Sequence, residues 1–514
     1  MGIFFKASHT MLGMSRSRAV GSGTVLISMT ALGSRPVAGA RVTISTPTSI
    51  SSMKCWGIET MDAIRLRFPQ GLFAALREQL LADTERESFA LLFGQRHRIN
   101  TRTMVKIVDV CHPRPEDYES RGLAHLHLRR EYVYDRLVEM QRRGDVDTLI
   151  DVHTHPFSER GAAFSVVDDR DEVLFHQWLN DTLDGIHYAS IVLSRGDYSA
   201  RLWEYEDGRP RARSARIKTQ TILERWPCLE DLDDPALLPA ALEPEQGFLA
   251  RSTLALGLDV LRHIVRDQCV AVVGVGGLGS AIAENLVHSG FHHLHLIDHD
   301  HVEMTNLNRI VGAYASDAKQ CRLKVEVVAE HLRRINPEAR IETHPVMIED
   351  ERLLPALVES DWILLSTDSH SSRYATQTLA LRFGIPLIAA GSNISVEEGR
   401  MTDMSGEVIL ARQGDRLCLN CLGRVAPTQI AAETVGGLGE VLERRGYVSG
   451  RAVKEPAVKT LNALIAALAV ETLINQYTGR PTVPILVYEG HALPRLYPDT
   501  DSVTQRRKDC FHCA

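Results

Sequence analysis

The sequence predicts an α/β protein with two domains, the second built on a doubly wound parallel sheet. Its 514 residues are enough for two or three domains with full cores. Strand and helix patterns alternate from about residue 60 to residue 206, and an apolar strand, a glycine turn and a helix follow one another from residue 269. A segment rich in proline and charge lies between these regions and marks a domain boundary.

Charge and composition narrow the class of protein. The 58 basic and 65 acidic residues give a net charge of −7, which argues against a nucleic-acid partner held by bulk electrostatics. No apolar run reaches the roughly 18 residues that a membrane span needs. The nine cysteines include two C-x-x-C pairs, which are typical of metal ligands in a reducing compartment. We therefore expect a cytoplasmic protein with no membrane partner.

Residues 1–52 differ in kind from the rest of the chain. They contain five basic residues and no Asp or Glu, a composition that also suits a transit peptide. We favour a disordered extension, or a true start at Met53 or Met61. The segment lacks a continuous apolar core of the signal-peptide type, so secretion is not expected.

The first domain is expected over residues 56–206. Apolar residues recur at helical spacing in residues 69–83, which begin with a proline, and in residues 130–144, which end at a glycine. Alternating or continuous apolar runs predict strands around these helices. In chain order the strands cover residues 85–94, 103–113 and 148–156, followed by a closing hairpin at residues 185–205.

A His-Thr-His sequence ends the strand predicted at residues 148–156. Because side chains alternate along a strand, His153 and His155 point to the same face, and two such nitrogens suit tetrahedral zinc. This spacing alone does not predict a metal site, since the chain contains three other pairs with it: His125/His127, His293/His295 and His299/His301.

Ser165 and Asp168 follow the pair, directly ahead of a predicted helix. Ser-x-x-Asp is typical of a helix N-terminus, where the hydroxyl caps the helix and the acid favours its positive end. The same carboxylate can supply a third zinc ligand and leave the fourth position to water. Glu87, at the start of an earlier strand, would then be a base able to deprotonate this water.

These residues together resemble the JAMM (JAB/MPN) metalloprotease motif, and the segment ESFALLFG resembles the family's stretch around its catalytic glutamate. Family members are zinc peptidases or isopeptidases that cut after the C-terminus of ubiquitin or ubiquitin-like proteins. The resemblance implies that His153, His155 and Asp168 bind a catalytic zinc. It also implies that Glu87 is the general acid and base and that Ser165 helps to hold the oxyanion.

The motif departs from the family pattern in one spacing. Nine residues separate His155 from Ser165, more than is usual, so Asp169 is an alternative ligand to Asp168. Inactive members of the family have lost these ligands, whereas this chain keeps every one. We therefore expect a catalytic domain rather than a bare scaffold.

Residues 207–248 are expected to form a linker. They contain most of EDGRPRARSARIK and all of EDLDDPALLPAALEPEQG, in which proline and charge dominate. Parts of this segment can pack as short helices.

The second domain is expected over residues 249–514. In CVAVVGVGGLGSAIAENLVHSG, Gly274, Gly276 and Gly279 allow a tight turn and a close approach of phosphate to a helix N-terminus. Asp298 ends the next strand, about where a ribose hydroxyl would be bound. A glycine turn alone is a weak signal, and the default interpretation would be a nicotinamide dehydrogenase.

Residues further along the chain favour another family. The segments TNLNRIVGAYASDAKQCRLKVEVV and DWILLSTDSHSSRYATQ, with the extra glycine of the turn, resemble the ThiF/MoeB and ubiquitin-activating enzyme family. The resemblance implies a Rossmann-like doubly wound domain of the ubiquitin-activating type, and a dehydrogenase has no need of these elements together. The residues that carry it are Gly277, Asp298, Asp300, Asn306, Asn308, Arg309, Lys324 and Asp368.

The chemistry of this family explains the residue types. A carboxylate attacks the α-phosphorus of ATP and pyrophosphate leaves, so positive charge must offset the repulsion between two anions. Arg309 and Lys324 would supply it, and Mg²⁺ on Asp368 would add more. Asp298 fits the ribose and Asn306 the phosphates.

One arginine precedes this fold in FLARSTLALG, where the family often carries an arginine that reaches the nucleotide of a partner subunit. Arg251 is the candidate for that role, and a plain surface arginine is the alternative. The resemblance thus implies a homodimer.

Four cysteines form two C-x-x-C pairs, a strong pattern for structural zinc. ThiF and MoeB proteins hold zinc through the same arrangement. The predicted ligands are Cys418, Cys421, Cys510 and Cys513.

The sequence therefore predicts a fusion of a JAMM peptidase with an adenylyltransferase, both acting on the C-terminal tail of one small β-grasp protein, ubiquitin-like or a sulfur carrier. The peptidase would trim or release the tail, and the second domain would adenylate the terminal glycine. A conjugating enzyme or a sulfur donor would take the product. Two alternatives are MccB-like adenylation of a ribosomal peptide and a regulatory scaffold of two inactive folds.

Overall fold

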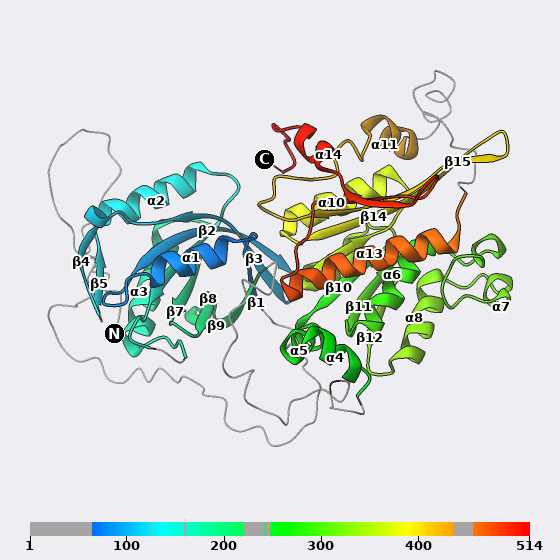
Figure 1. The fold of residues 1–514 in the computed structure, drawn as a ribbon. Helices are drawn as coiled ribbons and strands as arrows, with labels where there is room; N and C mark the ends of the chain where they lie inside the picture. Colours follow the sequence, from blue (N-terminus) through cyan, green and yellow to red (C-terminus); the bar gives the residue numbers. More distant parts are fainter. Residues whose placement is uncertain are drawn as a thin grey trace. The chain divides into compact units, whose positions relative to one another are not determined.

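The computed structural model describes residues 64–123, 125–158, 161–219, 242, 247–435 and 456–513. The extension predicted at residues 1–52 lies outside these ranges. The chain forms two compact units, which divide near residue 217 and are drawn in Figure 1. The predicted α/β fold class is confirmed.

The first unit is a closed barrel with the strand order β1-β3-β2-β6-β7-β8-β9. Helices α1, α2 and α3 accompany it, and a separate hairpin of β4 and β5 follows β3. The bounds are β1 Ile64–Arg67, α1 Leu72–Leu81, β2 Phe89–Ile99, β3 Arg102–Cys111, β4 Tyr118–Gly122, β5 His125–Leu128, α2 Arg130–Arg142, β6 Thr148–Thr154, α3 Val166–Thr182, β7 His187–Leu193, β8 Tyr198–Glu206 and β9 Arg209–Lys218.

Strand β6 stands in the middle of this strand order. It pairs with β2 on one side in antiparallel fashion and with β7 on the other in parallel fashion, and all seven of its residues are buried. A parallel pair needs a crossover connection, which α3 provides between β6 and β7. The chain leaves β6 at its carboxyl end and then enters α3. The His-x-His motif at the end of β6 is thereby brought close to the Ser-x-x-Asp motif at the start of α3.

The start of the predicted linker is a strand instead. Residues 207–248 were expected to connect the domains, but Arg209–Lys218 form β9, which pairs with β8 along its length. Only Ala215 of this strand is buried. Because the strand is rich in arginine and has almost no buried residue, its sequence indicated a charged loop, although its backbone continues the barrel. Most of the remaining segment lies outside the described residues.

The second unit is built on an eight-stranded sheet with the order β12-β11-β10-β13-β14-β15-β16-β17. Strands β10 to β14 are parallel and β15 to β17 extend the sheet in antiparallel fashion. The strands are β10 Cys269–Val273, β11 His293–Ile297, β12 Arg340–His344, β13 Trp362–Leu365, β14 Leu387–Glu397, β15 Arg400–Ala411, β16 Ile485–Glu489 and β17 Arg495–Pro498.

Helices cover both faces of this sheet. One buried core joins the sheet to α6, α8 and α13, and Figure 1 shows the long α13 beside α6. Helices α9 and α10 pack on β10 and β13. The helices are α4 Ala250–Leu256, α5 Leu258–Asp267, α6 Gly277–His288, α7 Ala315–Lys319, α8 Lys324–Ile335, α9 Leu354–Glu359, α10 His370–Phe383, α11 Pro427–Thr434, α13 Lys459–Thr478 and α14 Thr500–Gln505.

The strand order reverses between β10 and β13, because the chain first builds outward through β11 and β12 and then continues on the other side of β10. In open α/β sheets, ligands bind at the carboxyl ends of the strands at this switch point. The glycine turn after β10 and Asp368 after β13 both follow strands at this point. The doubly wound fold predicted from the sequence is confirmed.

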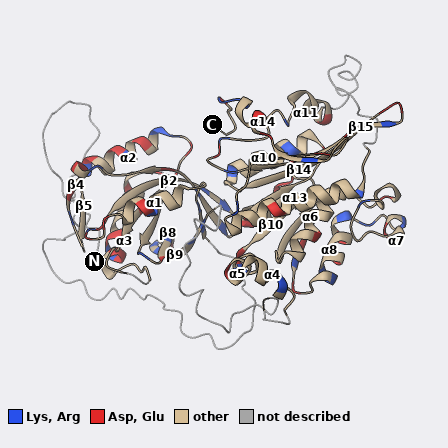
Figure 2. Cartoon of the chain, viewed as in Figure 1, with Lys and Arg blue, Asp and Glu red and all other residues tan. Residues whose placement is uncertain are grey.

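Charged residues of both signs are interspersed along the helices of both units (Figure 2). Within the described ranges, no helix combines the length and the apolar character needed to cross a membrane.

Candidate functional site

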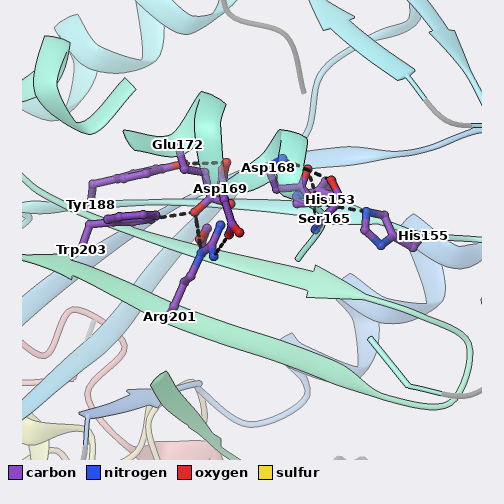
Figure 3. A network of polar contacts seen from close by, with 11 residues as sticks. His153, His155, Ser165, Asp168, Asp169, Glu172, Tyr188, Arg201 and Trp203 are labelled. Carbon is purple, nitrogen blue, oxygen red and sulfur yellow. Dashed lines mark hydrogen bonds and ion pairs between the residues drawn. The ribbon is translucent and has the colours of Figure 1, made fainter. Parts of the chain in front are cut away.

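Three predicted zinc ligands converge at the end of β6 in the first unit. Asp168 lies between the two histidines, with its Oδ1 3.6 Å from Nε2 of His153 and its Oδ2 3.7 Å from Nε2 of His155. All three residues are at most 5% exposed. His153 leaves β6 on the same face as His155, and Asp168 comes from the first turn of α3. Figure 3 shows the three side chains together.

This cluster fits a divalent cation. Nε2 of both histidines and Oδ1 of Asp168 are buried and have no hydrogen-bond partner among the residues that the structure describes. Ligand atoms each about 2.1 Å from a tetrahedral zinc would lie about 3.4 Å apart, close to the observed separations. A zinc ion there would satisfy all three atoms.

The pKa values of the two histidines reflect their burial and their contact with Asp168. Burial lowers the pKa of His155 to about 4, so this imidazole is neutral and can offer a lone pair. Burial also opposes the charged form of His153, but contact with Asp168 outweighs it and raises the pKa of His153 to about 9.

Glu87 is fully buried ahead of β2, next to the cluster in the sheet. The strand pairing sets Phe89 opposite His153, and the backbone of Ser88 bonds to Thr154. Both carboxylate oxygens of Glu87 are without a hydrogen-bond partner among the described residues, and burial raises the pKa of Glu87 to about 7. A carboxylate with such a pKa can accept and return a proton near neutral pH.

Ser165 is the N-cap of α3. Its Oγ accepts a hydrogen bond from the backbone N–H of Asp168 at 3.2 Å, and Oδ2 of Asp168 accepts one from the N–H of Ser165 at 2.6 Å. This capping box fixes the rotamer of Asp168 toward the histidines. The hydroxyl proton of Ser165 is not used by the cap.

The alternative ligand, Asp169, faces elsewhere. Its Oδ1 lies 2.5 Å from Nη1 of Arg201, on the opposite side of the helix start from the histidines (Figure 3). The geometry therefore favours Asp168 over Asp169 as the third ligand.

A buried polar network behind α3 was not predicted from the sequence. Oε2 of Glu172 accepts hydrogen bonds from Nε of Arg201 at 2.8 Å and from Nε1 of Trp203 at 2.7 Å, and also bonds to Ser190. Figure 3 shows this network beside the histidine cluster. It anchors the first two turns of α3 to β7 and β8, and with them the position of Asp168.

Asp151 is a second residue that the sequence could have indicated. It precedes His153 by two positions on β6, is 1% exposed and accepts a hydrogen bond from the hydroxyl of Tyr188 at 2.9 Å. Burial raises its pKa to about 8. The period of two in Asp-x-His-x-His was the available signal, since it sets all three side chains on one face.

The glycine turn of the second unit is tightly enclosed. Gly274 has φ +87°, a conformation that favours glycine. A Cβ at Gly279 would lie 1.8 Å from the carbonyl oxygen of Gly274, so the first turn of α6 packs directly on the turn before it. A Cβ at Gly276 would meet nothing within 4 Å, which leaves the space beside that residue open.

Arg309 lies against the start of α6. A Cβ at Gly277 would be 2.8 Å from Cδ of Arg309 and 2.6 Å from Nδ2 of Asn462, which no sequence pattern indicated. The guanidinium of Arg309 donates to the carbonyl of Thr305 at 2.8 Å. The methylene groups of Arg309 thus pack on the first turn of α6, and its guanidinium also bonds to Oδ1 of Asn308 at 3.0 Å.

Asp298 and Asp300 follow β11 as predicted. Oδ2 of Asp298 accepts the N–H of Val275 at 2.7 Å, which ties it to the glycine turn. Oδ2 of Asp300 lies 2.7 Å from Nζ of Lys324, the first residue of α8. This contact lowers the pKa of Asp300 against the effect of burial.

Three further predicted residues are placed as follows. Asn306 is buried and its Oδ1 accepts the N–H of Glu303 at 3.2 Å, so its oxygen caps the short helix Met304–Asn306. Asp368 is exposed after β13. Arg251 is exposed in α4, and its role as a contact to a partner subunit stays a prediction.

The four cysteines of the C-x-x-C pairs meet in space. Sγ of Cys418 lies 3.7 Å from Sγ of Cys510, and Sγ of Cys421 lies 3.9 Å from Sγ of Cys513. All four sulfur atoms lie within 4.8 Å of one another. Sulfur ligands each about 2.3 Å from a tetrahedral zinc would lie about 3.8 Å apart, so this cluster also fits zinc.

Family models match both units. A model described as "ThiF family" matches residues 249–508, and one described as "Prokaryotic homologs of the JAB domain" matches residues 69–203. The predicted resemblance to both families is thereby confirmed.

Curated relatives match between about a third and a half of the chain. A ubiquitin-like modifier-activating enzyme 5 from Drosophila virilis is 31% identical over 262 residues, covering 48% of this chain and 60% of that protein. An adenylyltransferase and sulfurtransferase uba4 from Aspergillus niger is 28% identical over 251 residues, covering 49% of this chain and 48% of that protein. The chain thus spans about half the length of the curated relatives that it matches.

Among solved structures, a crystal structure of E. coli MccB with succinimide covers 54% of this chain and 76% of that chain, with 20% identity and a TM-score of 0.42.

Proposed function

The chain belongs to the ThiF family, and we propose on this basis that its second unit adenylates the C-terminal carboxylate of a small ubiquitin-like or sulfur-carrier protein, using ATP and Mg²⁺. The observation that carries the proposal is the contact of Arg309 with the first turn of α6, at the glycine turn that follows β10. Open space beside Gly276, a helix N-terminus and a cation together suit the phosphates of a nucleotide.

The residues around the turn match the needs of this reaction. An oxygen of the carrier carboxylate forms a bond to the α-phosphorus, and the bond to pyrophosphate breaks. Arg309 and Lys324 would offset the negative charge that gathers during this step. Mg²⁺ held by Asp368 would supply further positive charge at the leaving group. Asp298, tied to the glycine turn, would bind the ribose hydroxyls.

For the first unit we propose a zinc-dependent peptidase or isopeptidase that trims or releases the tail of the same carrier. The convergence of His153, His155 and Asp168 beside a buried glutamate supports this proposal. A zinc ion held by these three residues would supply a Lewis acid for the scissile carbonyl. Glu87 would take a proton from the attacking water and deliver it to the leaving amine, while the hydroxyl of Ser165 donates to the oxyanion.

The two activities would act in sequence on one substrate. Cleavage of a precursor tail leaves a free carboxylate at the new C-terminus, and a free carboxylate is the nucleophile that adenylation requires. This order explains why a peptidase and an adenylyltransferase would be joined in one chain.

The test uses the full-length protein and a purified β-grasp carrier protein. ATP–pyrophosphate exchange should depend on the mature carrier, and a precursor with a short tail should support exchange only after cleavage. Exchange with a ribosomal peptide in place of the carrier would favour the MccB-like alternative. Zinc-loaded protein with neither exchange nor cleavage would favour the inactive scaffold.

A further inference from the structure

A second cluster of histidines and carboxylates lies in the second unit, on one face of the sheet. His293 and His295 lie two positions apart on β11, and Glu342 and His344 lie two positions apart on β12. The parallel register sets His295 opposite Glu342, with His344 one step further along. All four side chains therefore leave the sheet on the same side. The histidine pair on β11 does not predict a site by itself, because the other polar side chains of the cluster come from β12.

The polar atoms of this cluster are close to one another. Nδ1 of His295 lies 3.0 Å from Nε2 of His344 and 3.8 Å from Oε2 of Glu342. Nε2 of His293 lies 3.2 Å from Oε1 of Glu342. One ligand atom from each of His295, Glu342 and His344 can be chosen so that all three lie within 4.8 Å of one another. These separations bracket the roughly 3.4 Å expected between two ligands of a tetrahedral zinc ion.

The buried member of the cluster has a carboxylate behind it. His295 is 1% exposed, and its Nε2 has no hydrogen-bond partner within the described part of the chain. The closest carboxylate oxygen to this nitrogen is Oε2 of Glu359, at 3.7 Å, from the last residue of α9. Metal-ligating histidines commonly direct their second ring nitrogen to a carboxylate.

Such a polar group is unusual at this position. Both faces of a parallel sheet are normally apolar because helices cover them, and the opposite faces of these two strands carry Leu294, Leu296 and Ile341. Burying His295 costs free energy unless something compensates for its lost hydration. A cation shared by the cluster would provide that compensation.

We propose that His295, Glu342 and His344 bind a divalent zinc-type cation that joins β11 to β12. Nδ1 of His295, Nε2 of His344 and a carboxylate oxygen of Glu342 would be its ligands, with Glu359 orienting the ring of His295. His293 lies beside the carboxylate of Glu342 and is a further ligand within reach. Two imidazoles and one carboxylate are a ligand set that zinc accepts, with the fourth position left to water.

The cation would hold an outer strand of the sheet. Strand β12 is the first in the strand order and pairs only with β11 among the described strands. A bond from β12 to the buried His295 would fix it to the strand beside it. The site also has an approach for ions, since the side chain of Glu342 is 36% exposed.

Zinc binding by the full-length protein tests the proposal. The metal-free protein is loaded with Zn²⁺ in the presence of a chromophoric chelator, and bound zinc is counted by mass spectrometry. His344→Ala should lose one equivalent of zinc relative to the parent, and Glu342→Gln should weaken one equivalent by at least about tenfold. Neither variant should alter the zinc held by the four cysteines.

The matched control is His331→Ala. His331 also pairs with a carboxylate in the same unit, with Nε2 2.9 Å from Oε1 of Glu284, but it lies on α8 outside the cluster. This variant should bind as much zinc as the parent. If His344→Ala and Glu342→Gln keep the parent's stoichiometry and affinity, the two histidines form only a hydrogen bond and the proposal is wrong. Should His344→Ala fail to fold, the isosteric Glu342→Gln decides alone.

Discussion

Oδ1 of Asp169 lies 2.5 Å from Nη1 of Arg201, and this contact turns Asp169 away from the histidines that its neighbour Asp168 faces. Two adjacent carboxylates on one helix turn thus have different partners. One is positioned for a cation and the other is bound to an arginine that also contacts Glu172. This difference gives the sharpest test of the first candidate metal site.

Asp168→Ala should remove one equivalent of zinc, because two imidazoles alone are a poor site. Asp169→Asn should keep it, since that side chain contacts Arg201. The measurement is zinc content of the full-length protein after dialysis. Loss of zinc from Asp169→Asn, with Asp168→Ala still loaded, would reverse the assignment of the ligand.

Glu87→Gln should keep zinc and abolish cleavage of a carrier precursor, because the change removes only the base. In the unaltered protein the base works as a carboxylate, so the rate should fall as the pH drops through the pKa of Glu87. Burial raises this pKa to about 7, and a nearby cation would lower it, so the midpoint is expected at or below about 7. A Glu87→Gln protein that trims at the normal rate would show that another group is the base.

Adenylation should be separable from cleavage. Asp368→Ala should stop carrier-dependent ATP–pyrophosphate exchange, because it removes the proposed magnesium ligand, and should leave cleavage of a tailed precursor unchanged. Asp403→Ala is a suitable control, since Asp403 lies on β15 of the same unit and bonds to Ser405 and Asn393. Exchange that persists in Asp368→Ala would exclude the magnesium role.

The glycine turn allows a matched pair of substitutions. Gly279→Ala would set a Cβ 1.8 Å from the carbonyl oxygen of Gly274, and we expect a loss of about 1–3 kcal/mol in the free energy of unfolding. Gly276→Ala meets nothing within 4 Å and should change stability much less. Thermal unfolding of the two variants makes the comparison. Equal melting temperatures would mean that the turn is not packed as described.

Activation should stop at the acyl-adenylate. Conjugating members of the family pass the carboxyl group to a cysteine of their own, yet no cysteine lies between Cys421 and Cys510. Cys269 is buried in β10, Cys111 belongs to the first unit, and Cys55 and Cys228 lie outside the described residues. A thiolate bound to zinc is a poor nucleophile.

Among the cysteines that the structure describes, Cys321 is the remaining contender for a thioester. It is exposed, three positions before Lys324. After incubation with carrier, ATP and Mg²⁺, a non-reducing gel should show no thiol-sensitive band of enzyme joined to carrier. Such a band, absent from Cys321→Ala, would contradict the prediction.

Much of the fold and of the candidate sites could be predicted because their signals are local. The buried strands β6 and β10 are short apolar runs, and the capping box at Ser165 and the glycine turn each lie within a few residues of sequence. The convergence of the four cysteines also followed from two local pairs. The local structure of each of these segments could therefore be predicted from the residues next to it.

The features that escaped prediction depend on pairing between distant segments. Glu172 is part of a network only because it bonds to Arg201 and Trp203 on β8, and His295 is part of a cluster only because β11 pairs with β12. Strand β9 escaped because nine of its ten residues are not buried, and its backbone pairing with β8 leaves no pattern in the sequence. Single-sequence patterns do not contain strand register, so they cannot show which polar side chains share a face.

The position of β9 matters for anyone who divides the chain. A fragment of the first unit that stops at Glu206, where the sequence suggested a boundary, would leave the backbone N–H and C=O groups of β8 unpaired along one side. An open sheet edge of this kind recruits strands from other molecules and promotes aggregation. A fragment that extends through Lys218 keeps the ring of strands shut, and for this reason it is the better starting point for work on the first unit alone.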